Sequence, residues 1–92
     1  MRLTLTEKFQ KDCGTLSKSQ REQLFAVMLK LPQAMRDSHR HTGVGLRKLH
    51  PSGIFEARLG LGLRLLFAYK SQEIILHRIG NHDQIKKYLK TL

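Results

Sequence analysis

Three apolar runs between residues 55 and 79, separated by two short turns, constrain the fold of this chain more than any other feature. In residues 55–59 and 63–70 large apolar side chains recur at every second position, which is the period of a strand with one buried face. Residues 74–79 are almost continuously apolar, as expected of a central strand that is buried on both faces. The intervening stretches LGLG and KSQE are turns. We therefore predict an antiparallel meander of three strands.

The N-terminal part of the chain predicts one short strand followed by two helices. Residues 2–5 alternate as a strand, and Thr6 with Glu7 then marks the start of a helix that ends at Gly14. The stretch SKSQ has the capping-box pattern that begins a second helix. The apolar stripe of this helix consists of Leu24, Val27, Met28 and Leu31. Because Pro32 follows directly, we expect the helix to break or kink just after Leu31.

The remaining segments complete the predicted order. Residues 36–53 are polar, basic and rich in glycine, which indicates a loop or a weak strand, and residues 83–92 have apolar side chains at helical spacing. The result is an α+β fold, β-α-α-β-β-β-α, with an N-terminal strand and a helical hairpin packed on a small antiparallel sheet. The helices should cover one face, and Glu56, Arg58 and Arg64 should line the more open face. The 92 residues suffice for one modest core, so we expect a single domain over residues 1–92.

The charge balance favours a polyanionic partner. The chain has 17 Lys and Arg against 7 Asp and Glu, a formal net charge of +10. A compact domain with this charge repels itself unless a partner neutralises it. Nucleic acid is the first interpretation, an acidic protein is a second and compatible one, and a charge surplus that only confers solubility is a third.

Composition also excludes several classes of protein. No apolar run approaches the ~20 residues that a membrane-spanning helix needs. The stretch MRLTLTEKF lacks a long apolar core and a small-residue cleavage site, so we expect no signal peptide. The one cysteine, Cys13, rules out an internal disulfide framework and suits a buried thiol in a reducing cytoplasm. His39 and His41 have no cysteine or carboxylate partners at a ligand spacing, so we expect neither a metal site nor another cofactor.

The stretches GLRKLHPSGIFEARLGLGLRLLFAY and EIILHRIGNHDQIKKYL, in this order, carry a family resemblance. The chain resembles the RelE/ParE superfamily of toxins from type II toxin–antitoxin pairs along essentially its whole length. The ending RIGNHD is most similar to the branch with a histidine after the last strand, the YafQ-type ribosome-dependent mRNA endonucleases. The resemblance implies a RelE-like fold and metal-independent RNA cleavage.

The resemblance also implies site residues. His82, Arg64 and Tyr88 fall on catalytic positions of the family, with Arg64 on the arginine that holds the scissile phosphate. Two departures stand beside these matches: Glu56 replaces a lysine that RelE-like members can carry, and Lys86 replaces an aromatic residue of many histidine-type relatives. The positions that would bind RNA phosphates are Lys48, Arg58, Arg78 and Lys86.

Each of these residues has a structural alternative. His82 or Asp83 could cap the last helix, and Tyr88 could belong to the apolar stripe of that helix. Arg64 could form an ion pair with Glu56. The solvated surface explains Lys48, Arg58 and Arg78 equally simply, and His77 is better read as a sheet histidine than as a catalyst.

Three functions follow from the resemblance. The first is a ribosome-dependent mRNA endonuclease, which would use the 2′-OH of RNA as nucleophile, a histidine for proton transfer and arginine for phosphate charge. The second is a ParE-like gyrase inhibitor without catalytic residues, and the third is a detoxified relative. All three imply an acidic antitoxin partner. The first adds the ribosome and mRNA, and the antitoxin complex could bind operator DNA.

Overall fold

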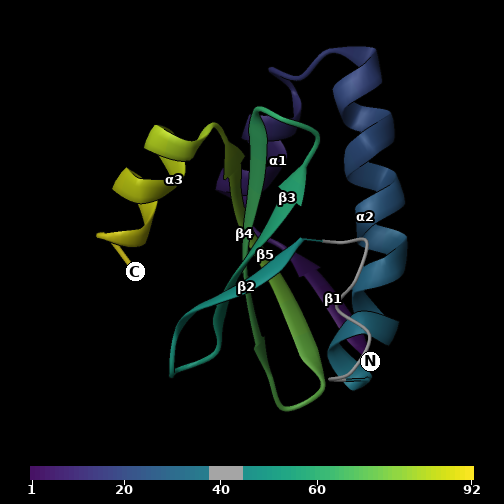
Figure 1. The fold of residues 1–92 in the computed structure, drawn as a ribbon, viewed down its shortest axis with the longest axis vertical. Helices are drawn as coiled ribbons and strands as arrows, with labels where there is room; N and C mark the ends of the chain where they lie inside the picture. The colour runs from purple at the N-terminus through teal and green to yellow at the C-terminus, as the bar shows by residue number, and fades with distance from the viewer. Residues whose placement is uncertain (38–44) are drawn as a thin grey trace.

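The computed structural model describes residues 1–37 and 45–92, and its elements confirm the predicted α+β class (Figure 1). Strand β1 and the two helices of the N-terminal part come first, four strands follow, and one helix ends the chain. The bounds are β1 Arg2–Leu5, α1 Glu7–Cys13, α2 Lys18–Arg36, β2 Leu46–His50, β3 Ile54–Leu59, β4 Leu63–Lys70, β5 Glu73–Gly80 and α3 His82–Leu89. No helix in these two ranges is both long and apolar enough to cross a membrane.

The strands form one sheet in the order β1-β5-β4-β3-β2. The meander β3-β4-β5 is antiparallel as predicted, whereas β1 joins the edge of β5 in parallel, so the sheet is mixed. Strand β2 lies within the stretch interpreted as a loop or a weak strand. Its pairing with β3 shifts register between Lys48 and His50. Because of this bulge, Leu46 and Leu49 are both half-buried although they lie three positions apart. The sequence of β2 therefore lacks the period-two pattern of a regular strand.

Helix α2 continues past Pro32 to Arg36, so of the predicted break or kink after Leu31 the break is wrong. Proline removes one backbone hydrogen bond, which normally destabilises a helix interior. Here the apolar stripe continues on the far side of the proline, where Ala34 is buried and Met35 packs against the core. Burial of these side chains against the sheet offsets the lost bond.

The main core lies between one face of the sheet and the helices α1 and α2. Phe9 of α1 and Leu24 and Leu31 of α2 pack with strand residues that include Leu65 and Phe67. The second face is covered only in part, because α3 contacts β4 and β5, where Leu66 of β4 and Ile85 of α3 are both buried. The second face of β2 and β3 therefore stays open beside α3.

Candidate nucleic-acid interface

Two arginines and one glycine form a row across the second face of the sheet. Arg58 of β3 is the direct cross-strand partner of Arg64 of β4, which in turn is the direct partner of Gly80 of β5. Direct partners project to the same face of a sheet, so both guanidinium groups lie on the face opposite the main core. Arg58 is exposed and Arg64 is half-buried. The row ends next to the start of α3.

Arg64 forms the ion pair with Glu56 that the sequence left open. Arg64 Nη1 donates to Glu56 Oε1 at 2.5 Å, and Glu56 is 6% exposed, the one buried charged residue in the described ranges. The pair holds the guanidinium plane in a fixed orientation. Within the part of the chain that the structure describes, Nε and Nη2 of Arg64 have no hydrogen-bond partner. They are the atoms available to an incoming oxyanion.

The residue that caps α3 is Asn81, so neither His82 nor Asp83 does. Asn81 Oδ1 accepts from the Gln84 N–H at 2.8 Å, and Gln84 Oε1 accepts from the Asn81 N–H at 2.8 Å. His82 is the first residue of the helix, and it is exposed. This excludes the capping alternative for His82, which is exposed two residues after Gly80, the end of the row.

The candidate site residues of α3 lie on two different flanks of the helix. Ile85 is buried against the sheet, and His82 and Lys86 lie one helical turn apart on one flank of the helix. Tyr88 lies on the other flank, where its ring contacts Arg78 of β5. The flank with His82 and Lys86 is therefore the one turned away from the Arg78 contact.

Arg78 and Tyr88 belong to a separate cluster. Arg78 makes two hydrogen bonds to Asp12 of α1, from Nε at 2.8 Å and from Nη2 at 2.9 Å. The hydrogen bond to Asp12 is the main reason why the pKa of Arg78 lies above its usual range. The guanidinium carbon of Arg78 lies 3.7 Å from the centre of the Tyr88 ring. Both side chains are therefore engaged with the protein itself.

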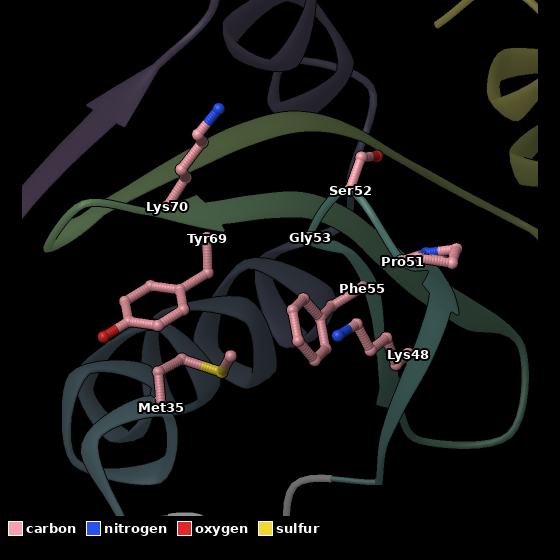
Figure 2. A pocket seen from close by; sticks show the side chains of 8 residues that line it. All are labelled: Met35, Lys48, Pro51, Ser52, Gly53, Phe55, Tyr69 and Lys70. Atoms are coloured by element: carbon pink, nitrogen blue, oxygen red, sulfur yellow. The ribbon is translucent and has the colours of Figure 1, made fainter.

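Lys48 lies on the other side of the sheet from the arginine row. It is the cross-strand partner of Phe55, whose ring stacks on Phe67 of the main core. The Lys48 Nζ atom lies 5.8 Å from the centre of the Phe55 ring. Figure 2 shows its amine directed at this ring, in a cavity of about 590 Å³ that Met35 of α2 also lines. The structure thus does not bring Lys48 together with His82 and Arg64.

Arg47 is a candidate that the sequence analysis missed. It is exposed and is the cross-strand partner of Glu56, so it lies on the same face as Arg58 and Arg64. Arg47 directly precedes Lys48, but its place on this face follows only from strand β2, whose sequence pattern is hidden by the bulge. The term second-face cluster is used below for Arg47, Arg58 and Arg64 on this face together with His82 and Lys86 of α3.

Two other titratable groups are affected by burial. Desolvation lowers the pKa of His77, which is half-buried in β5, and so favours its neutral form. Burial and the nearby Asp12 raise the pKa of Cys13, which favours the protonated, unreactive thiol. In residues 1–37 and 45–92 no three histidine, cysteine or acidic side chains lie close enough to bind a metal ion. His39 and His41 lie outside the described residues.

The arrangement of the sheet and helices matches solved structures of RelE-like toxins. YafQ from E. coli strain BL21(DE3) has a TM-score of 0.73 at 18% identity, over 92% of this chain and 98% of that chain. A chain of the E. coli DinJ–YafQ complex has a TM-score of 0.75 at 18% identity, with the same coverage. The RelB–RelE antitoxin–toxin complex from Methanococcus jannaschii contributes a chain with a TM-score of 0.67 at 15% identity, over 92% of this chain and 96% of that one.

No family model matches the sequence, and no curated protein matches it. The solved structures nevertheless show that this chain has the fold of the RelE/YafQ-like toxins, as the resemblance drawn from the sequence implied.

Proposed function

We propose that this chain is the toxin of a type II toxin–antitoxin pair, and that it cuts mRNA on the ribosome without a metal ion. One observation carries the proposal: the exposed His82 stands at the start of α3, beside the Arg58–Arg64–Gly80 row on the open face of the sheet. The similarity in fold to YafQ and RelE supports the class of protein.

RNA cleavage of this kind requires three things from the protein. A base must take the proton of the 2′-OH, a cation must stabilise the phosphorane, and an acid must protonate the leaving 5′-oxygen. The imidazole of His82 suits one of the two proton transfers near neutral pH. The Nε and Nη2 atoms of Arg64 suit two oxygens of the scissile phosphate, because Glu56 occupies only Nη1.

The other members of the second-face cluster would bind the RNA backbone. Arg47, Arg58 and Lys86 are exposed, and contacts from them to phosphates would carry no sequence information. A histidine alone contributes about 10²–10⁴-fold to the rate. The ribosome would supply much of the remainder by orienting mRNA in its decoding site.

The partner implied by the net charge is an acidic antitoxin. A chain with a net charge of +10 attracts an acidic segment, and such a segment over the second-face cluster would exclude RNA. Similar toxins have been crystallised with the partners DinJ and RelB. The antitoxin complex would be the form that binds operator DNA, and the toxin would act in the cytoplasm.

The test is controlled induction of the chain in a bacterium, following growth, translation and the 5′ ends of mRNA. We expect rapid arrest of translation with mRNA cut inside codons, and loss of both effects in the His82→Ala variant. His50→Ala is the matched control, since His50 is also exposed but pairs with Ile54, four positions along β3 from Arg58. DNA damage signalling with intact translation would instead support a ParE-like gyrase inhibitor, and an inert wild type would indicate a detoxified relative.

A further inference from the structure

Asp12 accepts a hydrogen bond from the edge of β5 at a position that strand β1 does not reach. Strand β1 covers the edge of β5 only as far as Leu76, and Thr6 makes the last contacts, to the carbonyl oxygens of Leu76 and His77. Beyond them the backbone N–H of Ile79 points outward. It donates to Asp12 Oδ2 at 3.1 Å. The carboxylate of α1 thus binds the free edge of β5 and the Arg78 side chain at once.

Arg78 links Asp12 of α1 to Tyr88 of α3. Its guanidinium is held at its edge by both oxygens of Asp12, and one face lies 3.7 Å from the centre of the Tyr88 ring. A bidentate carboxylate fixes the guanidinium plane, and an arginine over an aromatic face is attracted to it. Only 14% of the Asp12 side chain and 23% of the Arg78 side chain are exposed, so solvent screens this pair less than a surface pair.

Helix α3 has few other attachments. It is eight residues long, and Ile85 is its one buried side chain. The capping box at Asn81 fixes where the helix begins, but it does not fix the direction in which the helix runs. An isolated helix of this length is not stable by itself. Two anchor points define that direction: the buried Ile85, where α3 contacts β4 and β5, and Tyr88 on Arg78.

We propose that Asp12, Arg78 and Tyr88 form a positioning clamp, which holds α3 so that His82 and Lys86 keep their place beside Arg58 and Arg64. This inference rests on the proposed function, and it makes Arg78 and Tyr88 positioning residues that do not touch RNA. A misplacement of about 1 Å can cost about 10²-fold in rate. Loss of the clamp should therefore affect the chemical step more than RNA binding.

The experiment compares Asp12→Asn, Tyr88→Leu and Tyr88→Phe with the wild type, as purified full-length chains. Asp12→Asn removes the charge from the bidentate pair. Tyr88→Leu removes the ring and Tyr88→Phe keeps it. Cleavage of mRNA under multiple-turnover conditions, measured at several concentrations of programmed ribosomes, gives kcat and the half-saturating concentration. Amide hydrogen exchange of α3 and the NMR ring signals of His82 and His50 report on position.

We expect Asp12→Asn and Tyr88→Leu to lower kcat by about 10-fold to 10²-fold, with the half-saturating concentration changed by less than about twofold. Their α3 amides should exchange faster, and the ring signal of His82 should shift while that of His50 stays in place. Tyr88→Phe should behave as the wild type in every measurement.

Three results would overturn the clamp. Tyr88→Phe as inactive as Tyr88→Leu would assign the work to the hydroxyl group, as in a catalytic tyrosine. A raised half-saturating concentration with unchanged kcat would place Arg78 or its neighbours on the RNA. Unchanged exchange and His82 signals in Tyr88→Leu would show that α3 needs no clamp. If the wild type cuts no RNA, the proposed function fails, and the exchange and ring signals still decide on the clamp.

Discussion

Arg64 and Gly80 are direct cross-strand partners in β4 and β5, so α3 begins two residues after the backbone position that pairs with Arg64. The side chain of Gln84 occupies the space where Gly80 would carry a Cβ atom, with its Oε1 2.6 Å from that position. A Cβ atom at this position would therefore push the Gln84 side chain away from the Asn81 N–H. The motif RIGNHD combines the strand end, this space and the Asn81 cap in six residues.

Replacing Gly80 by alanine should displace Gln84 and break the capping box. We expect a loss of about 0.5–2 kcal/mol in the free energy of unfolding, the usual cost of a lost cap. Urea denaturation measures it. Gly62→Ala is the control, because a Cβ atom at Gly62 would meet nothing within 4 Å. Equal stability of the two variants would contradict this account of Gly80.

Replacing Arg64 by alanine should destabilise the fold as well as remove activity. The carboxylate of Glu56 would then be buried without a partner, at a cost of about 2–4 kcal/mol. The double variant Glu56→Gln, Arg64→Gln removes both charges and should recover most of this stability while remaining inactive. Thermal unfolding separates the two effects. A fully stable Arg64→Ala variant would show that the ion pair contributes little.

RNA binding should depend on the second-face cluster and not on Lys48. We expect Arg47→Gln and Arg58→Gln each to weaken binding of a single-stranded RNA and to reduce the slope of log affinity against log salt by about 0.7. Lys48→Gln should leave the slope unchanged, because Lys48 faces Phe55 on the helix-covered side. Fluorescence anisotropy titrations at several salt concentrations test this. A reduced slope for Lys48→Gln would mean that RNA reaches both faces.

The sequence predicted those elements whose signal is local. The period-two runs gave β3, β4 and β5, and the capping-box pattern at Ser17 gave the start of α2, where both hydrogen bonds are present. Strand β2 was obscured by its own bulge. The break predicted at Pro32 does not occur, because burial of Ala34 offsets the local cost of the proline. This is a tertiary effect that residue spacing does not reveal.

The candidate site divides in the same way. Arg58, Arg64 and His82 were predicted as site residues because they stand in a recognisable order along the chain. The role of Asp12 was not found, since its partner Arg78 is 66 positions away. That contact exists only because β1 ends early and α1 then crosses the free edge of β5.

The half-buried His77 should make the fold less stable in mild acid. Burial lowers its pKa below the ordinary value of 6.5, so the unfolded chain binds a proton more readily than the folded chain. The contribution of His77 to stability is complete above pH 6.5 and is lost as the pH falls toward its folded pKa. We expect the free energy of unfolding to fall less steeply with falling pH in His77→Gln than in the wild type. The comparison runs from pH 7.5 to 5.5, about one unit on either side of the ordinary histidine pKa of 6.5. His50→Gln, at an exposed histidine, should keep the slope of the wild type. Urea titrations at each pH provide the comparison, and identical slopes for the wild type and His77→Gln would show that burial of this ring has no cost in acid.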